Sequence, residues 1–504
     1  MTAEPLLAVP FVAWLILLPL TAAALAFLCQ RLQTLMVLAV AAGVPLMVAG
    51  LCWQVSLEGP RRHAVGGWDA AIGPDLYADG LTVLMLAMTA VVATSSSLYA
   101  LKYFSHAALK GTDTAPQVHR RDTFWPLWLI LWTALNALFL SADIFNIYVT
   151  LELLSLAAVA LVASSGGAAA LAAALRYLLV SLFGSLSYLL GVALLYSAFA
   201  SLDLALLSQV MTSGPVAWVS LALMTAGLLM KTALFPLHFW LPAAHANAPT
   251  PVSAVLSALV VKASFYLLLR LWFTAYPPGV PWATGQILGA LGAGAIIWGS
   301  IQALRQERLK LLVAYSTVAQ LGYLFLVFPL GRGAASFTAW SGVTLFAVAH
   351  ACGKAAMFLS AGSIAHAVGH DRFAEMEGSG QGLVLPLLTF ALAAISIIGL
   401  PPSGGFMAKW MLLNAALTSG QWWWVPVMAA GSLLASVYVL RVVERAFLSS
   451  AADGPRRPIP SLMKWSALSL ALAALFLGLF SGPQLDLLRV GAPLEERVLT
   501  EVDR

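Results

Sequence analysis

Long apolar runs, separated by short polar loops, follow one another along almost the whole chain. Most of these runs are close to the ~20 residues that a helix needs to cross a bilayer. The pattern therefore predicts an all-α polytopic membrane protein with about fourteen transmembrane helices. The predicted spans cover residues 6–29, 33–54, 80–103, 124–141, 143–165, 168–198, 215–236, 251–273, 283–304, 310–331, 337–364, 383–417, 421–447 and 460–481.

Two of these spans are interrupted by proline. The seventh breaks at Pro236 and is followed by a half-span at 237–247, and the twelfth breaks at GLPPSGG (399–405). Broken helices at corresponding places in two halves of a transporter indicate inverted repeats around a central site. We therefore predict two inverted five-helix repeats with helices 7 and 12 broken. No repeat is evident residue by residue, so this prediction depends on the breaks and the charges.

Four regions follow from this pattern. An N-terminal region of three helices (1–123) carries a periplasmic hairpin at 66–80, and a first repeat (124–273) follows it. A second repeat (283–448) precedes a fourteenth helix with a C-terminal tail (460–504).

Composition and charge support a membrane location. The chain is 61% hydrophobic and 9% charged, whereas soluble domains carry about 25% charged residues. The net charge of +5 does not indicate nucleic-acid binding, because basic residues in short loops set membrane topology. The side of the membrane whose loops carry more lysine and arginine is cytoplasmic. This places both termini on the periplasmic side of a bacterial inner membrane. The basic residues on the cytoplasmic side are Arg31, Lys102, Lys110, Arg120, Arg121, Arg305, Arg308, Lys310, Arg372, Arg441, Arg445, Arg456, Arg457 and Lys464.

Several ionisable residues fall deep inside the predicted spans. Glu152 lies nine residues after Asp143, which is ~13 Å at 1.5 Å per residue. Lys262 is ~16 Å into its span by the same rise. Lys354 is about as deep in the eleventh span, with His350 four residues earlier on the same helical face. Two more lysines, Lys231 and Lys409, lie beside the two breaks.

These charges have two interpretations. Buried ion pairs can fix helix packing, but one central carboxylate cannot neutralise several lysines. A charge at the bilayer centre costs at least ~2.5–3.5 kcal/mol. Burial also favours the neutral form of an amine, so such lysines can release protons near neutral pH. We therefore predict a proton path, bridged by His238, His350 and water. Ser316, Thr317 and Gln320 either hydrate this path or bond helix to helix.

Two other polar residues are interpreted more simply. His245 is taken as a cap of the broken seventh helix. Arg176 starts the sixth span near the cytoplasm, where it either pairs with a neighbour or reaches the interface.

Five stretches carry a resemblance to a known family. The chain resembles the proton-translocating antiporter-like subunits shared by respiratory complex I (NADH:quinone oxidoreductase), Mrp cation/proton antiporters and membrane-bound hydrogenases. The resemblance covers most of the chain in family order. The matching stretches are DIFNIYVTLELLSLAA (143–158), MKTALFPLHFWLPAAHANAPTPVSAVLSALVVKASFY (230–266), LLVAYSTVAQLGY (311–323), HACGKAAMFLSAG (350–362) and GLPPSGGFMAKW (399–410).

The resemblance implies a role for each matched residue. Glu152 matches the acidic residue of helix five and Lys231 its partner on helix seven. Lys262 matches the bridging lysine of helix eight, and His350 with Lys354 falls in the helix-eleven motif. Lysine at position 409 is more similar to the Mrp D branch than to the complex I subunit with glutamate there.

The function expected is that of a proton-translocating subunit of a multisubunit complex, most similar to the D-type subunit of Mrp antiporters. A proton-pumping subunit of a quinone reductase or hydrogenase is the alternative, with an inorganic-carbon transporter or an inert structural subunit further possibilities. The partners expected are other membrane subunits, lipid and H⁺, with Na⁺ exchanged elsewhere in the complex. No cofactor, metal site, catalytic site or nucleic-acid partner is expected, since no dinucleotide loop, cysteine cluster or haem motif is present.

Overall fold

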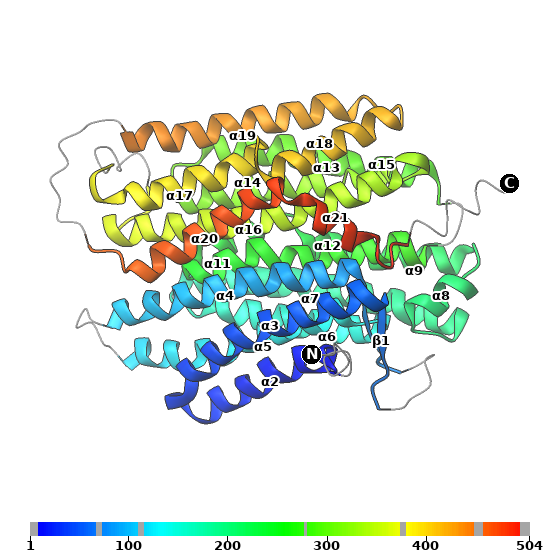
Figure 1. Cartoon of the computed structure of the whole chain (residues 1–504), viewed down its shortest axis with the longest axis horizontal. Coiled ribbons are helices and arrows are strands. Elements are labelled where there is room, and N and C mark those ends of the chain that lie inside the picture. Colours follow the sequence, from blue (N-terminus) through cyan, green and yellow to red (C-terminus); the bar gives the residue numbers. More distant parts are fainter. Residues whose placement is uncertain are drawn as a thin grey trace.

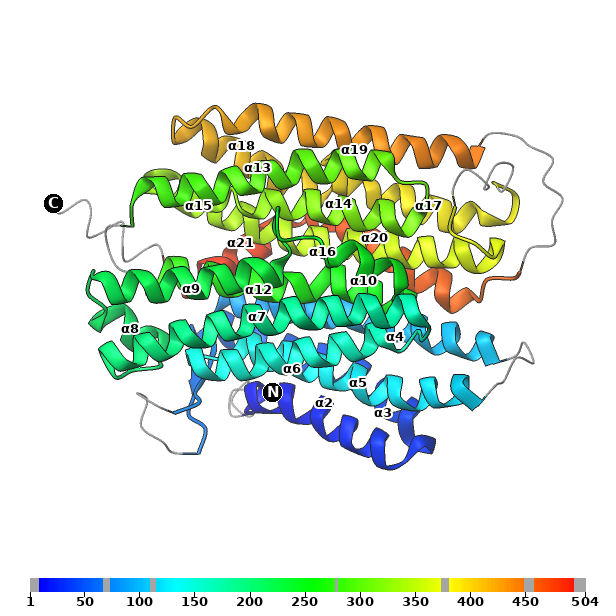
Figure 2. The same ribbon diagram turned by 180° about the vertical axis from the view of Figure 1, so that it is seen from behind.

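Thirteen helices in the described part of the chain are long and apolar enough to cross a membrane. The computed structural model describes residues 9–66, 73–108, 115–276, 280–372, 380–447 and 457–493. Figures 1 and 2 show the long helices running nearly parallel to one another in a single bundle. The predicted all-α polytopic membrane fold is thereby confirmed.

The first half of the bundle runs from the N-terminus to the eighth crossing. Its elements are α2 (Phe11–Leu28), η1 (Gln30–Leu32), α3 (Gln33–Glu58), β1 (Arg61–His63), β2 (Leu76–Ala78), α4 (Gly80–Ala108), α5 (Ala115–Leu140), α6 (Ile144–Ala163), α7 (Ala168–Phe199), α8 (Leu204–Val210), α9 (Pro215–Thr232), α10 (Leu241–Asn247), α11 (Thr250–Val255), η2 (Leu256–Val260), α12 (Val261–Arg270) and η3 (Leu271–Ala275).

The second half contains the remaining crossings and a short terminal helix. Its elements are α13 (Trp282–Arg305), α14 (Leu309–Leu324), α15 (Val327–Leu330), η4 (Gly333–Ala335), α16 (Ser336–Val368), α17 (Gly380–Ile398), α18 (Gly404–Thr418), α19 (Trp424–Phe447), α20 (Ser461–Leu479) and α21 (Ser481–Arg489). The apolar part of α17 (Leu383–Ile398) is shorter than the other crossings. With α17 and α18 taken as one interrupted crossing, the bundle has the fourteen crossings predicted from hydropathy.

Some residues used in the topology prediction lie outside the described side chains. They are the tip of the predicted hairpin (67–72) and the basic residues Lys110, Arg120, Arg121 and Arg456.

Both predicted breaks are present, and each leaves backbone groups that need partners. At the first break α9 ends at Thr232, and the Met230 carbonyl accepts bonds from the Ala233 N–H at 3.1 Å and the Trp240 indole at 3.0 Å. At the second break α17 ends at Ile398, and α18 begins after Ser403, which caps the Phe406 N–H at 3.2 Å. Such capping is required because lipid offers no hydrogen-bond partners.

Two backbone bridges occur at matching points of the predicted repeats. Asp143, just before α6, forms an antiparallel bridge with Asp203, in the segment after α7. Arg308, just before α14, forms the same kind of bridge with Arg372, in the segment after α16. In a five-helix repeat, α6 corresponds to α14 and α7 to α16. The bridges support the inverted repeats, whose boundaries stay a prediction.

Two crossings are enclosed by the others. The crossing that runs from α11 through η3 and the crossing formed by η4 and α16 each have their most apolar stretch fully buried. Lys262 lies on the first and Lys354 on the second, and both are 0% exposed. Their ammonium groups can therefore be served only by the protein or by internal water.

One end of the bundle is closed by a two-stranded hairpin and a buried ion pair. In the hairpin β1 pairs antiparallel with β2, and Asp79 directly precedes α4. Arg270 at the end of α12 donates to both Asp79 carboxylate oxygens, at 2.6 and 2.5 Å. It also donates to the Tyr266 hydroxyl at 3.0 Å and to Thr82 at 2.8 Å. The pair ties the third crossing to the eighth.

Replacing Asp79 with asparagine should destabilise the fold by about 3–5 kcal/mol, because the Arg270 guanidinium would remain buried without its counter-ion. The measurement is thermal unfolding of the purified protein in detergent. Asp486→Asn is the matched control, since the Asp486–Arg489 pair is 3.9 Å long and mostly exposed. A change below about 0.5 kcal/mol is expected there. Equal unfolding temperatures for the two variants would contradict the prediction.

Candidate functional site

Glu152 and Lys231 are in contact between α6 and α9. The Lys231 Nζ lies 3.6 Å from Glu152 Oε2, and the Ser185 hydroxyl of α7 donates to the same oxygen. Lys231 also donates to Ser155 at 2.6 Å and to Ser181 at 2.7 Å. The ammonium is thus held by one carboxylate and two hydroxyls, and the two residues that the resemblance pairs are in contact.

Local structure explains why this pair forms. Asp143 caps α6 by accepting from the Asn146 N–H at 2.6 Å, which fixes where the helix starts and hence the depth of Glu152. Ser155 lies one turn further along the same helical face. Lys231 is the next-to-last residue of α9, so the break that follows leaves its side chain beside α6 and α7.

Lys262 is held without a carboxylate. It is the second residue of α12, which directly follows the π-helix η2, and its Nζ donates back to the Ser257 carbonyl of η2. A helical side chain points towards the N-terminus of its own helix, so this contact follows from the helix direction. The nearest ordered acceptor is therefore a neutral backbone oxygen.

A line of hydroxyls joins Lys262 to Lys354. The Ser257 hydroxyl lies 2.8 Å from Thr317 Oγ1, and Thr317 and its neighbour Ser316 both donate to the Val313 carbonyl, at 3.0 and 2.9 Å. Lys354 of α16 in turn donates to Ser316. Ser316 and Thr317 therefore also bond helix to helix: Ser316 places its oxygen beside Lys354, and Thr317 contacts Ser257, whose carbonyl holds Lys262.

Lys409 uses the second break directly. Its Nζ donates to the carbonyls of Ile397 and Ile398 and to the Ser432 hydroxyl, each at 3.0 Å. The same nitrogen lies 4.4 Å from the centre of the Tyr323 ring. The carbonyls at the end of a helix carry its negative dipole, so they stabilise an ammonium. Lys409 thus satisfies the backbone groups that the break in helix 12 leaves free.

Several buried polar groups near these lysines have no hydrogen-bond partner among the described residues. Both ring nitrogens of His350 and of His245, and both amide atoms of Gln320, belong to this set. His350 lies within electrostatic range of Lys262, Lys354 and Lys409. Buried polar atoms without a protein partner normally bind water. The gaps between the lysines are therefore places for water in a proton path.

His245 is placed differently from the sequence interpretation. Its side chain does not cap α10, because the ring stacks on Phe358 at 4.7 Å and neither nitrogen donates to the backbone. Instead it lies within electrostatic range of Lys262, Lys310 and Lys354. Lys310 is the second residue of α14 and donates to the Ala248 carbonyl at 3.1 Å. His245 thus lies between a lysine near one end of the bundle and the central lysines.

His238 is not joined to the lysines by hydrogen bonds in the described part of the chain. Its ring stacks on Phe235 at 5.7 Å, and its Nδ1 has no partner among the described residues. It occupies the break between α9 and α10, where the sequence placed it.

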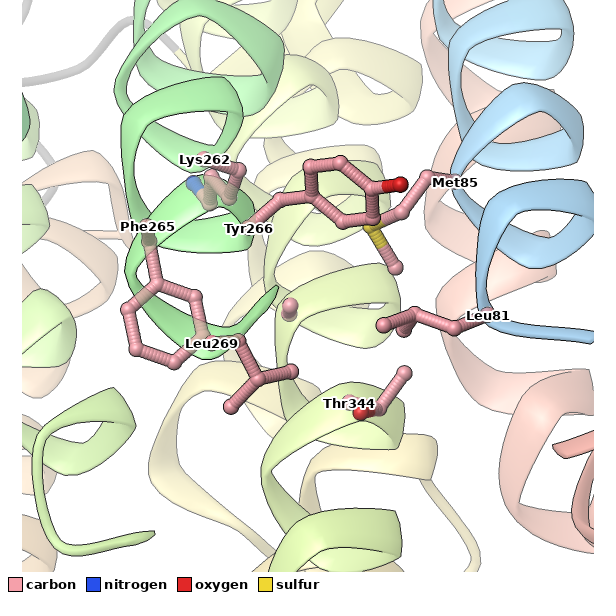
Figure 3. A pocket seen from close by; sticks show the side chains of 8 residues that line it. Leu81, Met85, Lys262, Phe265, Tyr266, Leu269 and Thr344 are labelled. Atoms are coloured by element: carbon pink, nitrogen blue, oxygen red, sulfur yellow. The ribbon is translucent and has the colours of Figure 1, made fainter. Parts of the chain in front are cut away.

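A small cavity, at the lower limit of what one water needs, adjoins Lys262. Tyr266 of α12, Met85 of α4 and Thr344 of α16 help to line it. Figure 3 shows the Tyr266 ring extending from beside Lys262 towards Met85. The Tyr266 hydroxyl accepts from Arg270 and donates to the Phe139 carbonyl at 2.9 Å. Tyr266 therefore lines the cavity beside Lys262 and also contacts Arg270 of the buried ion pair.

Sequence reasoning missed Tyr266, Arg270 and Asp79. Lys262, Tyr266 and Arg270 recur every four residues, which places them on one face of a helix. From that spacing the sequence could have predicted that the polar face of this helix continues from Lys262 to Tyr266 and Arg270. Asp79 carried no such signal, because its partner is far away in sequence.

Comparison with known proteins places the chain among membrane proteins of respiration and antiport. The family model described as NADH:quinone oxidoreductase/Mrp antiporter, TM, matches residues 141–435, which is more than half of the chain. The chain belongs to this family. The matched range contains the site from Glu152 to Lys409.

Named family members fall into two groups. The N subunit of the NADH-quinone oxidoreductase of Desulforudis audaxviator (strain MP104C) is 36% identical over 440 residues, which cover 84% of this chain and 85% of the relative. The D-type subunit of the Na(+)/H(+) antiporter of Bacillus subtilis (strain 168) is 27% identical over 477 residues, which cover 92% and 93%.

A solved structure shows the same fold. It is the structure of the Mrp complex from Dietzia sp. DQ12-45-1b, and one of its chains superposes with a TM-score of 0.84. The match covers 99% of this chain and 100% of that chain at 23% identity.

Asp143, which starts the helix that carries Glu152, has an unusual environment for a helix cap. Burial raises the pKa of Asp143 to about 6, against opposing bonds from Asn146 and Phe145, and the carboxylates of Asp203 and Asp75 raise it further. Arg62 pairs with both of those carboxylates, at 2.5 and 2.8 Å. Asp143 Oδ2 has no partner among the described residues.

Asp143→Asn should therefore change how stability depends on pH. The folded chain binds this proton more tightly than the unfolded chain, so ionisation of Asp143 lowers stability as pH rises from about 4 to about 6. The variant should be more stable than the parent at pH 7.5, by about 1–2 kcal/mol after solvent screening. The gain should vanish near pH 4. Unfolding temperatures in detergent at three pH values measure this, and a gain that is the same at every pH would contradict it.

Proposed function

We propose that this chain is a proton-translocating, antiporter-like subunit of a multisubunit membrane complex. The complex most similar to its own would be a Mrp-type monovalent cation/proton antiporter, with this chain in the place of the D-type subunit. The observation that carries the proposal is the contact between Glu152 and Lys231 beside a broken helix. Membership of the family supports it.

The proton path would use the ionisable residues named above. When the pair is closed, Glu152 stabilises the ammonium of Lys231. Opening the pair would leave that ammonium with two neutral hydroxyls, and the proton would pass through the break at Pro236 towards Lys262. Freed backbone groups and room for water at a broken helix favour such a transfer.

The second half of the path would run from Lys262 to Lys409. The hydroxyls of Thr317 and Ser316 support transfer to Lys354, and His350 with Gln320 and water supports transfer onward. His238 would serve the first break. The transported ion would be H⁺, because Glu152 is the single carboxylate at the centre among the described residues. A Na⁺ site built from oxygen ligands would lie in another subunit or at an interface.

A specific observation favours a second parent complex. The relative that is 36% identical is the N subunit of an NADH-quinone oxidoreductase, so the same chain would serve as the pump module of a redox enzyme. The chain itself would still carry only protons. Isolation of the complex through a tag on this chain would distinguish the two parent complexes. Small antiporter subunits in the isolated complex would indicate a Mrp-type antiporter, and iron–sulfur subunits would indicate a quinone oxidoreductase.

We infer that the complex lies in a bacterial inner membrane with the hairpin end outside. Gln54, near the end of α3, donates to the Val9 carbonyl at 3.0 Å, and Gly80, at the start of α4, donates to that of Val490 at 2.9 Å. Both described ends of the chain thus lie beside the hairpin. The opposite end carries Arg305, Arg308 and Arg441 among other basic residues, which supports a cytoplasmic location for it.

Lys231→Ala should lower proton transport by the reconstituted complex by at least about tenfold, which corresponds to 1.4 kcal/mol. Glu152→Gln should do the same while leaving assembly intact, because the amide nearly keeps the shape but loses the charge. The measurement is acidification of proteoliposomes reported by a pH-sensitive dye. Lys464→Ala, near the start of α20, is the control and should transport normally.

Normal transport in both site variants would refute the central role of the pair. In that case the buried charges would serve only to fix helix packing, and the chain would be a structural subunit.

A further inference from the structure

A polar face of α12 leads from the centre of the bundle to its hairpin end. Lys262, Tyr266 and Arg270 follow one another at intervals of four residues, which places them on one helical face. The eight residues from Lys262 to Arg270 correspond to only ~12 Å along the helix. If Lys262 carries a proton, this face needs a barrier, because the proton would otherwise leave through the hairpin end.

The outer end of this face is a group of buried residues that satisfy one another. Arg270 donates from Nη1 and Nη2 to the two carboxylate oxygens of Asp79, and from Nη2 to Thr82 as well. Its Nε donates to the Tyr266 hydroxyl, which donates to the Phe139 carbonyl. Asp79 Oδ1 also accepts from the Thr82 N–H at 2.9 Å. Every side-chain nitrogen and oxygen of the group thus has a protein partner, and none requires water.

This group differs from the histidines near Lys262. Both ring nitrogens of His245 and of His350 are buried and have no partner among the described residues. Both rings lie within electrostatic range of Lys262. Buried polar atoms of this kind normally bind water, and chains of water can carry protons. Lys262 therefore has water sites beside the two histidines, and a fully bonded group towards the hairpin.

The bonds of this group also run in directions that cannot pass a proton outwards. An arginine side chain only donates and stays protonated in proteins, so Arg270 cannot accept a proton. Its guanidinium occupies both carboxylate oxygens of Asp79. The hydroxyl hydrogen of Tyr266 is committed to the Phe139 carbonyl, and a carbonyl has no proton to hand on. A proton that reached the group would therefore stop there.

Apolar and outer layers enclose the group on its two sides. Leu81 of α4 and Leu269 of α12 are buried and line the cavity beside Lys262. Figure 3 shows them extending from opposite sides towards the middle of the cavity. On the outer side the Tyr77 ring of β2 lies 5.8 Å from the guanidinium carbon. The segment after α21 packs on Asp79 there, because a Cβ added at Gly491 would lie 2.8 Å from the Asp79 Cβ.

We propose that these side chains form a hairpin-end seal, which stops a proton on Lys262 from leaving through the nearer end of the bundle. The seal consists of Asp79, Leu81, Thr82, Tyr266, Leu269 and Arg270. Tyr266 is its positioning residue, because it lines the cavity and also bonds Arg270. The proposal rests on the proposed function, since a barrier beside Lys262 matters for transport only if Lys262 carries protons. With the seal closed, that proton moves on only towards Lys354.

Passive proton leak through the reconstituted complex tests the seal. Tyr266→Phe removes the hydroxyl between Arg270 Nε and the Phe139 carbonyl, and leaves room there for one water that can bond both. An imposed pH gradient should then collapse about tenfold faster than in the parent, because tenfold corresponds to 1.4 kcal/mol, about the worth of one buried hydrogen bond. A pH-sensitive dye inside the proteoliposomes measures the collapse. Combining Tyr266→Phe with Lys262→Met should abolish the added leak, since no lysine would supply the proton.

Tyr276→Phe is the matched control. Tyr276 follows α12 on the same crossing and is 6% exposed, and its hydroxyl lies 2.5 Å from Thr225 Oγ1. The control therefore loses a buried hydroxyl contact outside the seal, and its leak should equal that of the parent. Leu269→Thr is a second seal variant, which places a hydroxyl in the apolar layer and should also raise the leak. Unchanged leak in both seal variants, or an equal rise in Tyr276→Phe, would overturn the proposal.

Access of a small ion tests the seal without any transport. In a chain whose three cysteines, Cys29, Cys52 and Cys352, are replaced by alanine, Met85→Cys places a thiol on the cavity wall. Ag⁺ binds thiolates and should protect this thiol from later alkylation about tenfold faster when Tyr266→Phe is also present. Mass spectrometry of this chain, isolated from the intact complex, measures the protection.

The outcomes separate the seal from the proposed function. Faster Ag⁺ protection with a leak that persists after Lys262→Met would keep the barrier and refute Lys262 as a proton carrier. Slower transport in Tyr266→Phe, with leak and Ag⁺ protection unchanged, would make the hydroxyl part of the path and overturn the seal.

Discussion

The interior of a membrane offers an ammonium group no hydrogen-bond partners, so every buried lysine here must find its oxygen acceptors within the chain. Lys231 finds a carboxylate and two hydroxyls, and Lys409 finds the carbonyls at the end of α17. Lys262 uses a carbonyl of its own helix. The enclosure of α12 and α16, the two helix breaks and the buried hydroxyls all serve this requirement.

The two helix breaks provide oxygen acceptors for their lysines in opposite ways. At the first, the backbone and the Trp240 indole satisfy the freed carbonyl of Met230, so Lys231 remains available to a side chain that can move. At the second, Lys409 itself satisfies the freed carbonyls, and those belong to a fixed backbone. One lysine therefore depends on a contact that can open, while the other sits on a permanent dipole. The proposed direction from Lys231 to Lys409 is consistent with this asymmetry.

The sequence predicted the spans well because lipid dictates both their length and their apolar character. It predicted the breaks because proline cannot continue a helix, whereas the pairing of Glu152 with Lys231 came from the family resemblance. It could not predict contacts between distant segments, such as Arg270 with Asp79, because pairing across 191 positions depends on how helices pack. The sequence did not predict the orientation of the His245 ring for a similar reason. The ring stacks on Phe358, which lies on another crossing.

The bond between Gly80 and Val490 has a consequence for how the protein is made. Gly80 begins the third crossing, and a side chain there would collide with the Leu487 carbonyl of the segment that follows the fourteenth. The start of the third crossing therefore gains its backbone partner only after residue 490 has left the ribosome. Until then Asp79, whose Cβ faces Gly491, also lacks this neighbour. Docking of the 487–491 segment against the start of the third crossing would thus be a late step of biogenesis, reached only after the fourteenth crossing has been made.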